Sequence, residues 1–173
     1  MQNIFFDVDG VMRMLDTEVL GKQASRWELK VKGQYFVDYV SDNLHLLLTA
    51  PESEYCSVLK LWYEAFGPSE VTFLTCQPKT WQAFTTYWLK RRFPESKIIF
   101  VTKPEEKLSL IHHSNALLVE DYPNFSSYKN IILVDRVYNR HIDSPLLRVK
   151  KPADLLQVLV RMTDTGTEGV CNG

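Results

Sequence analysis

Two carboxylates near the amino terminus stand at a spacing that could do chemistry. Asp7 and Asp9 directly follow the apolar run at 4–6 and precede Gly10. If the run is a strand, side chains two residues apart point the same way, and α/β sheets bind ligands at the carboxyl ends of their strands. Because carboxylates this close repel each other, they favour a bound divalent cation. Mg²⁺, which takes one or two carboxylates plus phosphate oxygens, fits best.

The pair Asp9-Gly10 also has a simpler interpretation. Glycine lets the backbone turn sharply and lets a ligand come near. The same two residues are typical of a hairpin turn after a strand. Short motifs match by chance, so the pair alone favours the turn, and residues elsewhere in the chain must decide.

The composition excludes several classes of protein. The chain has 173 residues, of which 45% are hydrophobic, which is enough for one domain with a substantial core and a modest insertion. Lys and Arg number 20 against 21 Asp and Glu, so the net charge of −1 does not argue for binding nucleic acid or an anionic membrane. The given sequence shows no cationic stretch before an apolar run at its amino terminus, and no segment approaches the ~20 apolar residues of a membrane span. We expect a soluble, cytoplasmic protein without membrane partners or stable nucleic-acid binding.

The cysteines and the local basic clusters agree with that expectation. Cys56, Cys76 and Cys171 are odd in number and widely spaced, which suits neither a disulfide framework nor a zinc site. They indicate a reducing compartment. The basic runs at 90–92 and 150–151 are interpreted as solvated faces, because the total charge is balanced.

Alternating apolar runs and amphipathic segments predict an α/β fold, a Rossmann-like three-layer sandwich with a mostly parallel central sheet. The helix at 78–93 places Trp81, Phe84, Thr85, Trp88 and Leu89 on one face. The closing helix at 152–162 turns Leu155, Leu156, Leu159 and Val160 inward. A further helix is expected at 105–112, and strands are expected at 3–6, 71–74, 97–101, 116–119 and 130–134.

A long segment at 11–70 interrupts this alternation, and it is too long for one crossover helix. Helices are expected in it at 35–43 and 53–66. Inserted after the first strand, it would lie above the carboxylates and exclude water during chemistry. Its cations Lys22, Arg26, Lys30 and Lys32 could steer an anionic substrate. Most of its aromatic residues should form a small core and one or two should face a substrate: Trp27, Tyr35, Phe36, Tyr39, Trp62 and Tyr63.

Four motifs in order resemble those of the haloacid dehalogenase (HAD)-like phosphatase superfamily. The segment 7–11, Asp-Val-Asp-Gly-Val, resembles the first motif, in which a strand ends in Asp-x-Asp and usually glycine. Thr75 ends an apolar strand, as in the second motif. Lys107 near a helix start is similar to the third, and Glu120-Asp121 after an apolar strand is similar to the fourth. Each of the last three is common alone, and the combination is what makes the resemblance specific.

The resemblance narrows to the small 5′(3′)-deoxyribonucleotidase branch and covers about residues 2–160. The segment 120–124, Glu-Asp-Tyr-Pro-Asn, resembles the Asp-Asp-x-Pro-x of that branch, and 137–139 and 148–149 are similar to it too. Ala50-Pro51-Glu52 before a helix resembles its small helical cap. The resemblance implies a HAD-like core of 1–13 and 68–162, a cap of 14–67 inserted after the first strand, and a flexible tail at 163–173. A homodimer would be in keeping with this branch.

The resemblance implies a Mg²⁺-dependent phosphatase for nucleoside monophosphates. Asp7 would attack phosphorus and form an aspartyl-phosphate, while Asp9 would act as general acid and then as general base. Thr75 and Lys107 would bind the equatorial phosphate oxygens. Lys107 is preferred to Lys103, because Lys103 precedes a proline and is expected in extended loop.

The same resemblance assigns the metal ligands and the substrate contacts. Mg²⁺ would be held by the carboxylates of Asp7 and Asp121 and the backbone carbonyl of Asp9, with Glu120 acting through water. Two substrate-binding candidates depart from the pattern of the branch. Cys76 stands where a serine is more usual, so a thiol replaces the hydroxyl that would make one phosphate hydrogen bond. Arg13 either reaches a phosphate or a base, or is a surface arginine at the cap hinge. Glu120 itself replaces the usual aspartate.

Other functions remain open from the sequence. One alternative is a phosphatase for polynucleotide 3′ ends or for small sugar phosphates, and the shape above Asp7 would decide between these substrates. Another is a non-catalytic regulatory protein that binds a nucleotide. The presence of both Asp7 and Asp9 argues against the latter, because losing either is the cheapest route to a dead site.

Overall fold

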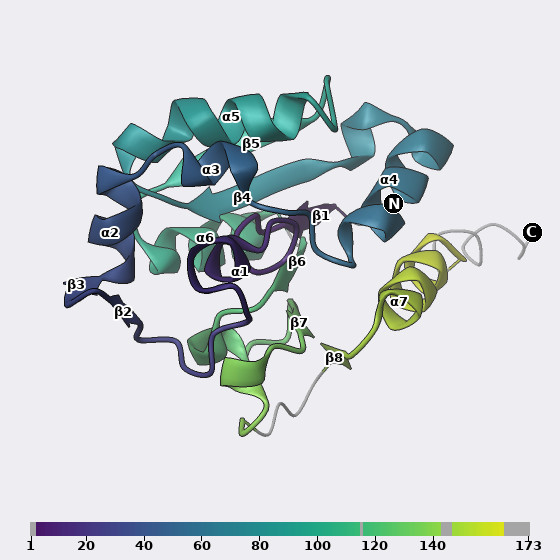
Figure 1. Cartoon of the computed structure of the whole chain (residues 1–173). Coiled ribbons are helices and arrows are strands. Elements are labelled where there is room, and N and C mark those ends of the chain that lie inside the picture. Colours follow the sequence, from purple (N-terminus) through teal and green to yellow (C-terminus); the bar gives the residue numbers. More distant parts are fainter. Residues whose placement is uncertain (1–2, 115, 143–146, 165–173) are drawn as a thin grey trace, which may run out of the picture.

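The computed structural model describes residues 3–114, 116–142 and 147–164. Its centre is a sheet of six strands in the order β5-β4-β1-β6-β7-β8, with every neighbouring pair parallel (Figure 1). This confirms the predicted α/β fold. The short last strand was not predicted, because two residues cannot show an alternating pattern. The strands are β1 (Ile4–Phe6), β4 (Thr72–Cys76), β5 (Lys97–Val101), β6 (Leu117–Glu120), β7 (Ile131–Val134) and β8 (Arg148–Val149).

Helices cover both faces of the sheet and make three layers. Successive strand residues point to opposite faces, so Phe73 and Val119 pack in one apolar cluster while Leu74 and Leu118 pack in another. The first cluster is closed by α4 (Cys56–Phe66), α5 (Gln82–Lys90) and α7 (Pro152–Asp164). The second is closed by α6 (Pro104–His113). β4, β6 and β7 are therefore apolar on both faces, as buried parallel strands must be.

The helix α5 keeps its predicted face, although its ends differ. A 3-10 turn, Lys79–Trp81, precedes it, and the helix ends at Lys90 rather than at residue 93. Four of the five residues predicted on one face are buried and the fifth, Phe84, is half-buried. Further 3-10 turns lie at Pro68–Glu70, Pro123–Phe125 and Val137–Asn139.

Only two of the four residues predicted on the inward face of α7 are buried. Leu155 and Leu159 are fully buried, but Leu156 is 37% and Val160 43% exposed. Residues one position apart lie about 100° apart around a helix, so a helix packed through a narrow stripe buries only one residue of each pair. The helix also runs to Asp164, into the predicted tail, while 165–173, with Cys171, lies outside the described residues.

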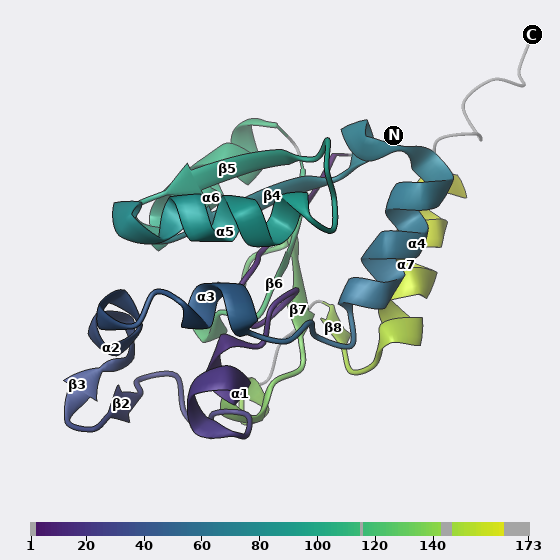
Figure 2. The same cartoon turned by 45° about the horizontal axis from the view of Figure 1, so that its top comes forward.

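A small insertion follows β1. It contains α1 (Leu15–Leu20), the antiparallel pair β2 (Lys30–Val31) and β3 (Gln34–Tyr35), α2 (Phe36–Asp42) and α3 (Leu46–Thr49), and it leads into α4. Figure 2 shows the hairpin and α2 at one end of the molecule and α4 beside α7 at the other. The hairpin, α1 and α3 were not predicted. The hairpin turn is made by Lys32 and Gly33, both with positive φ, a conformation that suits a two-residue turn.

The insertion has the small core that was expected, though of different residues. Leu15, Val40, Leu47 and Ala50 pack there with Trp81 at the start of α5. Among the aromatic residues predicted for it, Phe36 packs against this cluster, whereas Trp62 and Tyr63 join the main core instead. Trp27 and Tyr35 are 48% and 63% exposed.

The two ends of the insertion meet beside β1. The amide of Met14 donates to the carbonyl of Pro51 at 2.9 Å, and the amide of Ser53 donates to Met12 at 2.8 Å. The chain therefore leaves and re-enters the α/β layers at one place. None of the helices in the described part of the chain is long and apolar enough to cross a membrane.

Candidate functional site

Four acidic or polar residues meet at the carboxyl ends of three adjacent strands. Asp7 directly follows β1 and continues its ladder, since its amide donates to Val119 at 2.9 Å. Thr75 lies near the end of β4, Glu120 is the last residue of β6, and Asp121 directly follows it. Because β1 lies between β4 and β6, the parallel order brings residues from three distant parts of the sequence to one edge.

Three of these side chains form a buried acidic group. Asp7, Glu120 and Asp121 each have a carboxylate oxygen within 4.8 Å of the others, and all three are buried. Asp121 Oδ1 has no hydrogen-bond partner among the residues that the structure describes. Buried carboxylates without compensation are costly, so the group is suited to a cation that prefers oxygen ligands.

Lys107 supplies part of that compensation. Its ammonium nitrogen lies 2.7 Å from Asp7 Oδ1 and 2.7 Å from Glu120 Oε2. The helix α6 begins at Pro104, so Lys107 falls in its first turn, where it is only 4% exposed. Lys103, its rival, precedes the helix and is exposed. When all four groups are ionised, one ammonium and three carboxylates leave an excess of two negative charges. One divalent cation would balance this excess.

The titration of these groups reflects their crowding. Burial, with the charge of Glu120 next, raises the pKa of Asp7 to about 8, although Lys107 opposes it. Burial and the charge of Asp7 likewise raise the pKa of Asp121 to about 6. Burial also raises the pKa of Glu120. Burial alone lowers the pKa of Lys107, but the two carboxylates outweigh it and the net shift is upward. A proton or a cation must therefore relieve the repulsion among the carboxylates.

Asp9 lies beside this group with its carboxylate turned to other partners. Arg13 Nε donates to Asp9 Oδ1 at 2.7 Å, and Gln77 Nε2 donates to Asp9 Oδ2 at 2.5 Å. The Asp9 side chain is 26% exposed, whereas that of Arg13 is fully buried. The alternative of a surface arginine at the hinge is therefore wrong. A role for the Asp9 carbonyl in a metal shell stays a prediction.

A cavity of about 180 Å³ opens over the carboxylates. Thr75, Cys76 and Lys107 reach it from the polar side, while Trp27 of the insertion and Tyr122 form an aromatic wall with ring centroids 4.8 Å apart. The predicted contacts of Thr75 and Cys76 with a phosphate stay predictions. The described residues that line the cavity are Asp7, Asp9, Trp27, Thr75, Cys76, Pro104, Lys107, Glu120, Tyr122 and Phe125.

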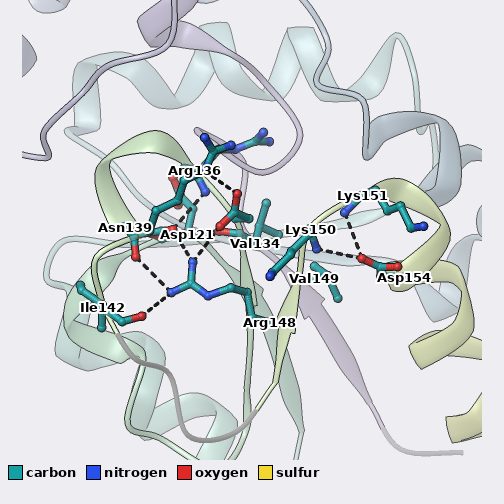
Figure 3. A network of polar contacts seen from close by, with 12 residues as sticks. Asp121, Val134, Arg136, Asn139, Ile142, Arg148, Val149, Lys150, Lys151 and Asp154 are labelled. Atoms are coloured by element: carbon teal, nitrogen blue, oxygen red, sulfur yellow. Dashed lines mark hydrogen bonds and ion pairs between the residues drawn. The ribbon is translucent and has the colours of Figure 1, made fainter.

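A network of polar side chains supports Asp121 from the β7 side (Figure 3). The Tyr138 hydroxyl donates to Asp121 Oδ2, and Asn139 Nδ2 donates to the Asp121 carbonyl at 3.0 Å and to Val134 at 2.9 Å. Arg148 in turn holds Asn139, with Nη1 donating to Asn139 Oδ1 at 2.9 Å. These bonds fix the segment after β6 against the end of β7.

Several residues of the site had no assigned role in the sequence. Tyr138 and Asn139 contributed only to the family resemblance, and Gln77 and Arg136 carried no prediction. Trp27 belongs to the aromatic residues of the insertion, of which one or two were expected to face a substrate, and it lines the cavity. Arg136 is 1% exposed and donates from Nε to the Gly10 carbonyl at 2.6 Å. Gln77 and Arg136 each follow a predicted strand, so their position at the carboxyl edge was a signal that could have found them.

A larger groove of about 760 Å³ lies elsewhere, between α3, α4 and α5. Glu52 bridges two of its cations, Lys60 at 2.7 Å and Arg92 at 2.8 Å, and Arg92 also lies over the ring of Trp88. Its charges are thus largely satisfied by one another, and none of its lining residues belongs to the acidic group. Size alone does not make it the better candidate site.

Comparison with models of known protein families gave no match for this sequence. Comparison with curated proteins gave no significant relative. What stands is a parallel six-stranded α/β sheet with a buried group of Asp and Glu side chains, at the end of its central strand β1, that could hold a metal ion.

Proposed function

We propose that the protein is a Mg²⁺-dependent phosphomonoesterase that hydrolyses nucleoside monophosphates. The observation that carries this proposal is the buried group of Asp7, Glu120 and Asp121 with the ammonium of Lys107 against it. Carboxylates and a lysine at the end of a central parallel strand are the parts that phosphoryl transfer needs, because catalysis there is mostly positioning and charge stabilisation.

Asp7 and Asp121 are the proposed ligands of Mg²⁺. Asp121 Oδ1 has no protein partner among the described residues. The three carboxylates carry two more negative charges than Lys107 offsets when all are ionised, and a divalent cation would balance that excess. Glu120 is more fully occupied, since Oε2 pairs with Lys107 and Oε1 accepts from the Asp121 amide at 3.0 Å. This supports an indirect role for Glu120 through water. When bound, the cation would stabilise the negative charge of the phosphoryl oxygens.

The proposed reaction has two steps on Asp7. In the first, an Asp7 carboxylate oxygen attacks phosphorus, the bond from phosphorus to the ester oxygen breaks, and protonated Asp9 gives its proton to the leaving alkoxide. In the second, water attacks the aspartyl-phosphate while the Asp9 carboxylate takes its proton. The bond from phosphorus to Asp7 breaks, which releases inorganic phosphate and restores both side chains.

The cavity favours a substrate with an aromatic group beside the phosphate. About 180 Å³ is room for a phosphate and part of a sugar, so a base would lie at the mouth, where Trp27 stands 48% exposed. Tyr122 and Phe125 line the same side. Aromatic side chains bind bases by stacking, which favours nucleotides over plain sugar phosphates.

Phosphate release from a panel of substrates tests the proposal. The panel holds deoxyribo- and ribonucleoside 5′- and 3′-monophosphates, glucose 6-phosphate and a DNA oligonucleotide with a 3′-phosphate, each with Mg²⁺ and with chelator. We expect turnover of monophosphates that chelator abolishes and that Asp7→Asn lacks. Arg161→Gln, which removes an exposed charge on α7, is the matched control and should stay active.

Three results of this panel would count against the proposal. Hydrolysis that survives in Asp7→Asn would exclude Asp7 as the nucleophile. Turnover of only the DNA 3′-phosphate or glucose 6-phosphate would overturn the proposed substrate class, although the protein would still be a phosphatase. Absence of turnover together with nucleotide binding would instead favour a regulatory nucleotide-binding protein.

A further inference from the structure

We infer that Arg13 is a positioning residue for Asp9, and that it aligns the acid–base carboxylate from behind, out of contact with substrate. The inference rests on the proposed function. Its basis is the set of contacts that the Arg13 guanidinium makes on three separate parts of the chain.

The first contact is a two-pronged pair with Asp9. Nε donates to Oδ1 at 2.7 Å and Nη2 donates to Oδ2 at 3.1 Å. Such a fork fixes the plane of a carboxylate as well as its position, which a lysine ammonium cannot do. The Asp9 side chain is 26% exposed and the Arg13 side chain is fully buried, so the arginine lies on the protein side of the pair.

The remaining donors of Arg13 hold the guanidinium itself. Nη1 donates to the carbonyl of Leu47 in α3 at 2.9 Å, and Nη2 donates to Thr85 Oγ1 in α5 at 3.0 Å. The ring of Trp88 lies 5.5 Å from the guanidinium carbon. The side chain that orients Asp9 is therefore anchored both in the insertion and in a helix of the α/β layers.

The backbone keeps Arg13 and Asp9 in a fixed relation. The Arg13 amide donates to the carbonyl of Val8 at 2.8 Å, and the Gly10 amide donates to the carbonyl of Arg13 at 2.8 Å. Gln77 Nε2 donates to Asp9 Oδ2 at 2.5 Å, the oxygen that also accepts from Arg13 Nη2. Asp9 is thus held by two side chains, while its remaining surface lines the cavity.

A direct contact of Arg13 with substrate is the competing interpretation. Asp9 lines the cavity, but Arg13 is not among the described residues that do so. With no exposed surface and partners on all three of its nitrogens, the guanidinium acts through Asp9.

This arrangement has a consequence that depends on the leaving group. When Asp9 passes its proton to the ester oxygen it becomes a carboxylate, and the adjacent guanidinium stabilises that charge. A nucleoside alkoxide is a poor leaving group and needs the proton, whereas p-nitrophenolate leaves without one. Arg13 should therefore matter for nucleotides and much less for p-nitrophenyl phosphate.

The test compares kcat/KM for both substrates, because this quantity reports formation of the aspartyl-phosphate and not its later, shared hydrolysis. Arg13→Gln should lower kcat/KM for a nucleoside 5′-monophosphate about 10- to 100-fold and that for p-nitrophenyl phosphate less than about 3-fold. Asp9→Asn should show the same selectivity more strongly. Arg161→Gln, the loss of an exposed arginine on α7, should change neither value.

The other outcomes are distinct. An equal loss of kcat/KM for both substrates would show that Arg13 is merely structural. A loss confined to KM for the nucleotide would show that Arg13 contacts the substrate. Either result overturns the inference about Arg13 and leaves the proposed function standing. If the wild type hydrolyses neither substrate, the proposed function fails and the inference with it. Arg13→Lys keeps the buried charge without the fork, so it carries the same test where Arg13→Gln does not fold, and the same selective loss is expected.

Discussion

Lys107 Nζ lies 2.7 Å from Asp7 Oδ1, so the first turn of α6 brings a buried ammonium group onto the carboxylate that ends β1. The same nitrogen is 2.7 Å from Glu120 Oε2. One side chain therefore joins a helix to two neighbouring strands at the point where the acidic group is most crowded. Removing the Lys107 side chain should therefore lower both the free energy of unfolding and the catalytic activity.

Lys107→Met should destabilise the metal-free protein strongly. Loss of one partner from a buried ion pair costs about 3–5 kcal/mol, because the other charge is left without compensation. Lys103→Met, at an exposed lysine four residues earlier, should change the free energy of unfolding by less than about 0.5 kcal/mol. Urea denaturation of both variants measures this. Equal stability of the two would show that the Lys107 pairs contribute nothing.

The stability of the metal-free protein should fall as pH rises from about 4 to about 8. Burial and neighbouring charges raise the pKa of Asp7 from 3.8 to about 8. Across this range the folded chain keeps a proton on Asp7 that the unfolded chain has lost. Ionisation of Asp7 therefore works against folding, by at most about 1.4 kcal/mol per pH unit for this one proton. Denaturation in chelator at several pH values measures the slope. Asp7→Asn should reduce the slope, while Asp121, whose pKa burial raises to about 6, keeps part of it at lower pH. A rise in stability with pH would contradict the assignment.

Gly10→Ala should disrupt the site, whereas Gly33→Ala should only strain a turn. Both glycines have positive φ, +84° and +85°. A Cβ at Gly10 would overlap the carboxylate of Asp121 and approach the Tyr138 hydroxyl, but at Gly33 it would meet nothing within 4 Å. The backbone strain, about 1–2 kcal/mol, is common to both, so the difference in unfolding free energy isolates the steric clash. Equal losses would mean that the two side chains move aside freely.

Leu155→Ala should cost far more stability than Leu156→Ala. Leu155 is fully buried against the main core and Leu156 is 37% exposed. A buried leucine truncated to alanine costs about 2–5 kcal/mol, and the exposed neighbour should lose less than about 1 kcal/mol. Thermal or urea unfolding of the two variants decides it. Comparable losses would place a partner over the outer face of α7.

Trp27→Ala should weaken the binding of nucleotides selectively. A stacked base is worth about 1–3 kcal/mol, so KM for a nucleoside monophosphate should rise about 5- to 100-fold, while KM for p-nitrophenyl phosphate changes little. Tyr35→Ala, at an aromatic residue 63% exposed on the hairpin, is the control and should leave both unchanged. An unchanged KM for nucleotides in Trp27→Ala would remove Trp27 from the substrate site.

The strand ends could be predicted because they depend on local pattern. Asp7, Thr75 and Glu120-Asp121 each follow a short apolar run, and parallel strands bring such positions to one edge whatever lies between them. Lys107 could be assigned from Pro104, which marks a helix start. The site was thus predictable wherever chemistry follows directly from the end of an element.

The partners of Asp9 could not be predicted in the same way. Arg13 donates to Thr85, 72 residues away, and Gln77 donates to Asp9 across 68 residues. Such bonds follow from the packing of whole elements, which no local pattern encodes. The same holds for Leu156, whose apolar side chain is compatible with either face until the helix docks.

The two ends of the insertion meet through the hydrogen bonds of Met14 with Pro51 and of Ser53 with Met12. Changes in the insertion can therefore evolve separately from changes in the acidic group. Residues added or removed between α1 and α2, away from the Leu47 carbonyl that anchors Arg13, alter mainly the length of a closed loop, which costs about 0.6 kcal/mol for each doubling of its length. The carboxylates and Lys107 belong to elements outside that loop. New substrate preferences can therefore arise by lengthening or exchanging the part of the insertion between α1 and α2, which holds Trp27, while the residues that carry the reaction stay under separate selection.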